Sequence, residues 1–168
     1  MGKFLVFILV AIVAADNFVL VGGPIFPGTS LSTGMSMTVD SEENIYVSFA
    51  RDSFPIISQI ATDMPDVWHP MVNPFSHPIV SRPFRMAMGG EFLYSLYPNP
   101  LTGGITCQRN GRGSMDPWLD FWSSPETSSV YGIKTHLLSG EVYIVYIVGE
   151  MACIAIESDG VWMLESLI

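Results

Sequence analysis

Short apolar runs alternate with turn-forming residues along most of the chain. In the segment 44–49, Ile45, Val47 and Phe49 alternate with more polar neighbours, which is the two-residue period of a β-strand with one buried face. The run 142–148 is apolar at nearly every position, as expected for a strand that is covered on both faces. After residue 16, no stretch combines a 3.6-residue apolar period with an N-cap and ten residues free of Pro or paired Gly. The pattern therefore predicts an all-β protein.

The order of these runs repeats about every 48 residues. Each repeat holds an apolar strand, a turn, a second strand with a tyrosine, a third apolar run, and an Asp shortly before a Trp. The tyrosines are 48 and 49 residues apart, at Tyr46, Tyr94 and Tyr143. The Asp-then-Trp pairs are Asp66 and Trp68, Asp116 and Trp118, and Asp159 and Trp162. We therefore expect a single all-β repeat domain over 16–168, with antiparallel four-stranded units at about 30–68, 80–118 and 128–168.

Four short strands in 40–50 residues are typical of a β-propeller blade. The segment 39–48 reads Val-Asp-Ser, two glutamates, then Asn-Ile-Tyr-Val-Ser. It resembles the inner strands of NHL-type and related bacterial propeller repeats, in which the Asp and Asn shape the turn between the first two strands. The resemblance is specific over about ten residues and covers most of 34–168 in outline. It implies a β-propeller-like fold, without giving a function.

Three units are fewer than the four to eight blades of a closed propeller. Half a propeller would leave an apolar face and sheet edges open at each end. We therefore expect the ring to be completed by dimerisation about the propeller axis. A sandwich, a small closed barrel, an open stack and a fragment of a longer propeller are the alternatives.

The first fifteen residues differ in character from the rest. One basic residue, Lys3, precedes the apolar or small run 4–15, which ends in small residues before Asp16. This arrangement is typical of a secretory signal peptide, and the run is short for a membrane-spanning helix. We therefore expect residues 1–15 to be removed and the mature protein to be secreted, with no stable membrane insertion. In an oxidising compartment Cys107 and Cys153 permit one disulfide, but the sequence favours their interpretation as small apolar residues on buried strands.

Composition limits the possible partners. Sixteen acidic and seven basic residues give a formal charge of −9, so there is no basic surface for a phosphate backbone and we expect no nucleic acid. A hydrophobic content of 49% is too high for a disordered chain.

The search for catalytic or metal-binding chemistry finds little. His69 and His77 lack a zinc-site spacing, His136 falls within a predicted strand, and the acidic turn 40–44 lacks the glycine of a calcium loop. No Gly-x-Ser-x-Gly elbow occurs. We expect no cofactor, no metal and no catalytic residue. A Ser-His-Asp arrangement that depends only on geometry is an open alternative.

Some residues are nevertheless candidates for contact with a ligand or partner. Arg109 and Arg112 flank a predicted Asn-Gly hairpin turn, where they would contact an anion. Aromatic side chains outside the repeat would stack on a sugar ring, anchor a protein, or cover the unit interfaces. They are Phe75, Phe121 and Trp122.

These observations favour a non-enzymatic binding or assembly protein whose repeated β surface is presented to a glycan or a protein, including copies of itself. The alternatives are a structural subunit of an extracellular filament or matrix, and a propeller-type hydrolase.

Overall fold

The computed structural model describes residues 31–51, 54–64, 67–71, 85–124, 128–136 and 139–166. Within these ranges the chain is all-β and forms three four-stranded antiparallel sheets, as the sequence predicts. We call them units 1, 2 and 3 in chain order. Unit 1 contains β1 (Leu31–Val39), β2 (Ile45–Arg51), β3 (Phe54–Ile60) and β4 (His69–Pro70). Unit 2 contains β5 (Arg85–Gly89), β6 (Phe92–Pro98), β7 (Ile105–Gly111) and β8 (Leu119–Ser123). Unit 3 contains β9 (Ser128–Thr135), β10 (Val142–Val148), β11 (Met151–Ser158) and β12 (Val161–Ser166).

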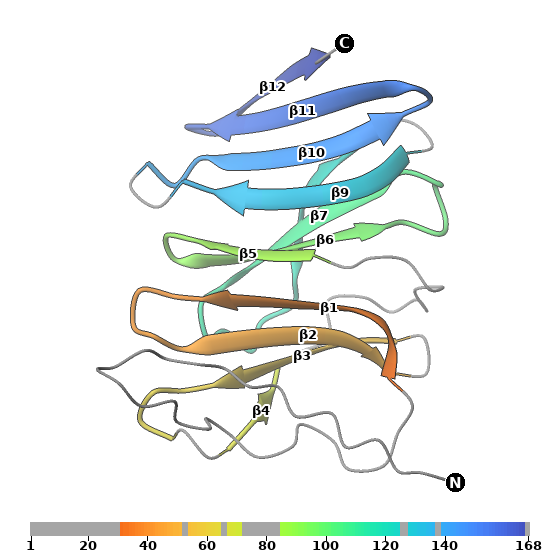
Figure 1. Cartoon of the computed structure of the whole chain (residues 1–168). Helices are drawn as coiled ribbons and strands as arrows, with labels where there is room; N and C mark the ends of the chain where they lie inside the picture. The colour runs from red at the N-terminus through yellow and green to blue at the C-terminus, as the bar shows by residue number, and fades with distance from the viewer. Residues whose placement is uncertain are drawn as a thin grey trace, which may run out of the picture.

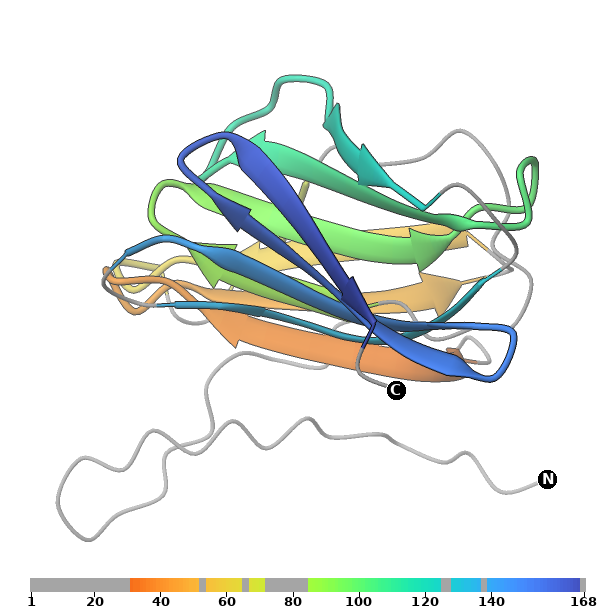
Figure 2. The same ribbon diagram turned by 90° about the horizontal axis from the view of Figure 1, so that it is seen from above.

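The three sheets lie one upon another, with unit 2 between the other two (Figure 1). Within each unit the strands follow chain order across the sheet, so every connection is between neighbouring strands. The first strands of the units lie side by side, because β5 contacts both β1 and β9. Seen from above, the units overlie one another with their strands rotated relative to each other (Figure 2). Within the described ranges no helix has the length and apolarity that a membrane crossing requires.

The pairing register repeats from unit to unit. Tyr46 pairs with Thr38, Tyr94 with Ala87, and Tyr143 with Lys134, so the three tyrosines hold one position in the repeat. This confirms the equivalence that the sequence predicts, and it fixes which residues of the three units correspond.

Units 1 and 2 bury side chains on two faces, whereas the buried apolar side chains of unit 3 lie on the face toward unit 2. We call the face toward the previous unit the preceding face, and the opposite one the following face. Tyr46 and Ile57 on the following face of unit 1 pack against the preceding face of unit 2, which contributes Met86, Met88, Leu93, Tyr97 and Trp118. A second core lies between units 2 and 3 and includes Tyr94, Leu96, Cys107, Ile133, Val142, Ile144 and Tyr146. A fully buried aliphatic side chain contributes about 1.5–3 kcal/mol, so these two interfaces hold the units together.

The repeated tryptophans also keep one orientation. Trp118 belongs to the core between units 1 and 2, and Trp162 packs on the core between units 2 and 3. Trp68 packs on a third cluster on the preceding face of unit 1, formed by Ile45, Val47, Phe49 and Ile60. In each unit the tryptophan at the end of the repeat therefore packs on the preceding face.

The structure corrects three local expectations. His136 lies just after β9 instead of inside a strand, because its backbone closes the turn with Glu141. Arg109 and Asn110 belong to β7, where they pair with Tyr94 and Leu93, and the turn follows at Arg112 and Gly113. One face of the strand β10 is buried and the other is only partly covered, since Val145 is 36% exposed. Phe75, His77, Asp66 and residues 1–30, including the predicted signal peptide, lie outside the described residues.

Candidate functional site

The turn between β1 and β2 is organised by the carboxylate of Asp40. It accepts hydrogen bonds from the backbone amides of Glu42 and Asn44, both at 2.9 Å, and from the Asn44 side-chain amide at 2.9 Å. It also accepts one from the Tyr46 hydroxyl at 3.1 Å. Burial and the adjacent Asp40 carboxylate raise the pKa of Tyr46. The Asp and Asn therefore shape this turn, as the resemblance to propeller repeats implies.

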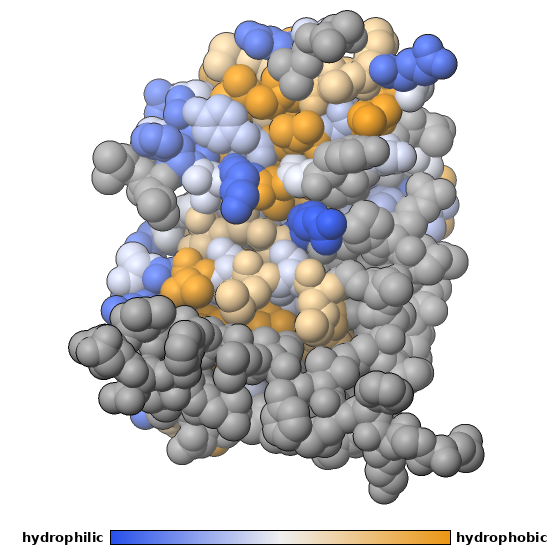
Figure 3. Space-filling model, viewed as in Figure 1, coloured by the Kyte–Doolittle hydropathy of each residue, from blue (hydrophilic) through white to orange (hydrophobic). Residues whose placement is uncertain are grey.

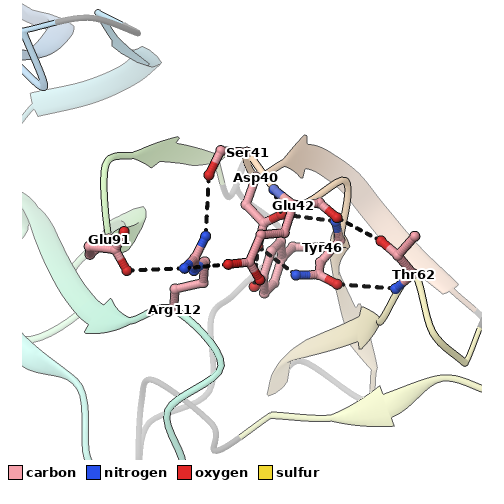
Figure 4. A network of polar contacts seen from close by, with 8 residues as sticks. Asp40, Ser41, Glu42, Tyr46, Thr62, Glu91 and Arg112 are labelled. Carbon is pink, nitrogen blue, oxygen red and sulfur yellow. Dashed lines mark hydrogen bonds and ion pairs between the residues drawn. The ribbon is translucent and has the colours of Figure 1, made fainter.

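Arg112 links units 1 and 2 beside the turn between β1 and β2 (Figure 4). Its guanidinium lies 2.8 Å from a carboxylate oxygen of Glu42 and 3.2 Å from one of Glu91, and it donates to the Ser41 hydroxyl at 3.2 Å. The arginine side chain is 18% exposed, whereas the two glutamates are 62% and 74% exposed. Two carboxylates already contact this guanidinium, so its role in this arrangement is to join the hairpins of neighbouring units.

Arg109 lies in a different environment from Arg112. Its guanidinium carbon is 4.7 Å from the centre of the Phe92 ring and 4.6 Å from that of Phe121. A cation between two aromatic rings is stabilised by both, roughly 0.5–1 kcal/mol per ring at an exposed site. Burial raises the pKa of the neighbouring Tyr94, and the charge of Arg109 opposes that shift. The two arginines that the sequence groups together therefore serve separate contacts.

Phe121 and Trp122 lie in β8 and belong to a ring cluster between units 2 and 3. Trp122 is 5.3 Å from Tyr146 and 5.5 Å from Trp162, measured between ring centres. Phe121 lies 5.3 Å from Trp162, edge to face, and 5.2 Å from Tyr94. These aromatics are partly buried and cover the interface between two units, which is one of the roles the sequence leaves open for them.

A serine, a histidine and a glutamate meet in the turn between β9 and β10. The Ser139 hydroxyl lies 2.9 Å from Nδ1 of His136 and donates to Glu141 at 2.9 Å. Hydrogen bonds from Tyr143, Ser139 and Ser158 lower the pKa of Glu141. In a catalytic triad the imidazole stands between the hydroxyl and the carboxylate, whereas here the hydroxyl occupies that place. The arrangement therefore orders the turn without activating the serine.

Two further sets of residues bear on metal and disulfide chemistry. Within the described ranges no three His, Cys, Asp or Glu side chains gather as a metal site would require. Cys107 is fully buried with a free thiol, and burial raises its pKa. Cys153 also carries a free thiol and packs on the same core from unit 3.

Part of the exposed apolar surface of the described residues lies on the two outward faces of the stack. On the preceding side of unit 1, the β1 residues Met35, Met37 and Val39 are 44–51% exposed. On the following face of unit 3, Val145 is 36% and Met163 49% exposed. The space-filling view shows hydrophobic surface at the level of unit 3 and again near β1 (Figure 3). The sequence predicts an open apolar face at each end, but the residues that form these faces could not be named from it, because their identification requires the register of the strands.

No family model matches the chain, and no curated protein matches it. Among solved structures it is similar to a quinoprotein alcohol dehydrogenase-like protein from Bacteroides thetaiotaomicron VPI-5482, with 19% identity and a TM-score of 0.57 over 78% of this chain. It is also similar to Xyloglucan PUL GH43B from Bacteroides ovatus, with 10% identity and a TM-score of 0.54 over 83% of this chain. The matched parts are 33% and 31% of those proteins, so the chain spans about a third of their length.

Likeness at this level of identity concerns the fold. Together with the three four-stranded antiparallel sheets, it defines an all-β, β-propeller-like protein, in agreement with the resemblance that the sequence carries.

Proposed function

We propose that the protein is a secreted, non-enzymatic propeller module that acts by binding and assembly, with its two outward faces joined to another propeller-type sheet. The observation that carries this proposal is the open following face of unit 3. The same position in units 1 and 2 is a closed core, in which Tyr46 and Tyr94 are 0% and 4% exposed. An apolar face that is built like an internal interface is typical of a surface that receives a partner.

Export is part of the proposal and is supported by the apolar run 4–15 with its single preceding lysine. Amino-terminal sequencing of the protein recovered from the medium of expressing cells tests it. A mature end near Asp16 supports export, and retention of the full chain within cells contradicts it.

The assembly role is tested by the mass of the purified chain in solution. Light scattering on a size-exclusion column is expected to give at least twice the 18.5 kDa of one chain, or the corresponding multiple after signal removal. Val145→Glu, on the open face, is expected to lower that mass to one chain, because a carboxylate would be buried without a partner. Leu119→Glu is the matched control, because Leu119 is 62% exposed elsewhere, in β8. That variant is expected to keep the wild-type mass. A monomeric wild type at 100 µM, an arbitrary high concentration, contradicts the assembly role.

Glycan binding is a second candidate, and the partly exposed rings of Phe121 and Trp122 favour it, since aromatic faces stack on sugar rings. One structural neighbour has xyloglucan in its name. Retardation of the chain in a native gel containing xyloglucan, and loss of that retardation in Phe121→Ala, would support this candidate. Equal mobility with and without the polysaccharide contradicts it.

A further inference from the structure

The two outward faces of the stack correspond, position by position, to the two sides of its internal interfaces. The register equates Met37 and Val39 of β1 with Met86 and Met88 of β5. The β5 residues are 6% and 7% exposed because unit 1 covers them, whereas Met37 and Val39 are 51% and 46% exposed. The first strand of unit 1 therefore carries the preceding half of an inter-unit contact with nothing of the described chain upon it.

The following half of the same contact is open on unit 3. The register equates Val145 with Ser48 and Leu96, which are both 0% exposed, while Val145 is 36% exposed. Next to it in β11, Ile154 is half-buried and corresponds to Ile57 and Cys107, which are both 0% exposed. The following half of one repeated interface and the β1 part of its preceding half are thus displayed by a single chain, at opposite ends of the stack.

The internal interfaces show how the first strands meet. The backbone amides of Met86 and Met88 donate to the hydroxyls of Ser36 and Thr38, at 3.0 and 3.2 Å. The register equates Ser36 with Gly132 and Thr38 with Lys134. Gly132 presents only hydrogen on this face, and a Cβ built there meets no atom of the described chain within 4 Å. By this equivalence, Gly132 is the point at which β9 would meet Met37 of another unit 1.

We propose that the following face of unit 3 receives unit 1 of a second copy of this chain, and that two such contacts close a ring of six units. The contact is centred on the first strands, with β9 of one copy against β1 of the other. It does not extend across the preceding face of unit 1, because Ile45, Val47 and Phe49 are already 1–2% exposed within one chain. A head-to-tail contact closes a ring when its rotation matches the symmetry, and otherwise gives an open polymer.

This inference rests on the proposed assembly role, and disulfide trapping tests the geometry separately. We would prepare Met37→Cys and Gly132→Cys, each with Cys153→Ala, and oxidise them alone and as a one-to-one mixture. The proposal predicts a disulfide-linked pair in the mixture and none in either sample alone, since a disulfide needs Cα atoms about 4.4–6.8 Å apart. A chain with Ser36→Cys and Met86→Cys supplies the geometry control, because it reproduces the equivalent pair inside one molecule.

The outcomes distinguish a failure of the head-to-tail geometry from a failure of the assembly role. A pair formed by Gly132→Cys alone would mean that unit 3 packs on unit 3, which overturns the head-to-tail geometry and leaves the assembly role standing. A mass of two or more chains without any trapped pair would also overturn the head-to-tail geometry and leave the assembly role standing. The double variant Met37→Cys with Gly132→Cys is expected to stop at a linked pair, and a ladder of longer products would overturn the closed ring in favour of a polymer. A monomeric mass with no trapped pair contradicts the assembly role itself.

Discussion

Asp40 connects the local turn with the core of unit 1. Its side chain is 7% exposed and accepts four hydrogen bonds, one of them from the fully buried Tyr46. Replacement by alanine would leave that hydroxyl without its acceptor and would remove the two bonds to backbone amides. We expect Asp40→Ala to lower the free energy of unfolding by about 2–3 kcal/mol, measured by urea denaturation.

Asp63 provides the matched control for this substitution. It lies in the exposed turn after β3, and Asp63→Ala is expected to change the free energy of unfolding by less than about 0.5 kcal/mol. If Asp40→Ala were as stable as Asp63→Ala, the carboxylate would not be what holds the turn.

Tyr97 makes stability depend on pH at the alkaline end. It is 8% exposed, and burial, with a smaller contribution from the Asp120 carboxylate, raises its pKa to about 12. An unfolded tyrosine ionises near 10, so the unfolded chain loses this proton first. The stabilising contribution is therefore complete below pH 10 and is lost as the pH rises toward 12, amounting to roughly 2 kcal/mol. Denaturation at pH 9, 10 and 11 should show this fall, and Tyr97→Phe should reduce its slope; an unchanged slope would refute the assignment.

At the scale of single residues, the sequence indicated which residues form a turn better than it indicated which partners their side chains contact. The aspartate and asparagine of the first turn behave as the pattern of turn residues predicts, because an Asx turn depends on a few neighbouring atoms. Arg109 and Arg112 are only three residues apart, yet one lies between two rings and the other pairs with carboxylates of two units. That separation depends on where β7 ends, and the Asn-Gly pair favoured a turn two residues too early.

At the scale of the elements, β5 and β9 approach closely at Gly89. A Cβ built on Gly89 would lie 2.7 Å from Cγ2 and 3.0 Å from Cβ of Thr135, whose hydroxyl donates to the carbonyl of Met88. We expect Gly89→Ala to lower the free energy of unfolding by about 1–3 kcal/mol, because Gly89 and Thr135 both belong to packed strands. Chemical denaturation of the variant gives the value.

Two further variants test whether this contact is the cause. Thr135→Ser removes Cγ2 and keeps the hydroxyl, so in combination with Gly89→Ala it should restore part of the lost stability. Gly111→Ala is the control, since its Cβ would approach nothing closer than 3.4 Å. Equal losses in Gly89→Ala and Gly111→Ala would show that the strand spacing tolerates a methyl group.

The strands themselves were predictable because each carries its own apolar pattern and turn residues. The predicted run 142–148, for example, coincides with β10 (Val142–Val148), and the run 44–49 differs from β2 (Ile45–Arg51) only at its ends. The prediction of two covered faces for 142–148 was wrong for one face, since Val145 is exposed. A continuous apolar strand indicates that both faces are fit for burial, but the number of units decides whether a neighbour is present.

At the scale of the whole molecule, the stack has the repeated interior of a propeller and two outward faces of the same chemistry. The chain spans about a third of the structures it resembles, and the described residues hold three of the units that those faces would fit. With a formal charge of −9, two copies repel at long range, and salt screens that repulsion. The proposed association of two copies is therefore expected to depend on concentration and ionic strength.

Association of this kind links stability to protein concentration. A partner that binds only the folded chain stabilises it by RT ln(1 + [L]/Kd), so the melting temperature should rise as the chain is concentrated. Over a hundredfold range above the dissociation constant, the gain approaches about 2.7 kcal/mol. Gly132→Glu should abolish the dependence without lowering the melting temperature of the dilute protein, because a Cβ added at Gly132 meets no atom of the described residues within 4 Å. Leu119→Glu should keep the dependence, and a wild-type melting temperature that is the same at 1 and 100 µM, both arbitrary concentrations, would remove the physical basis for a second copy.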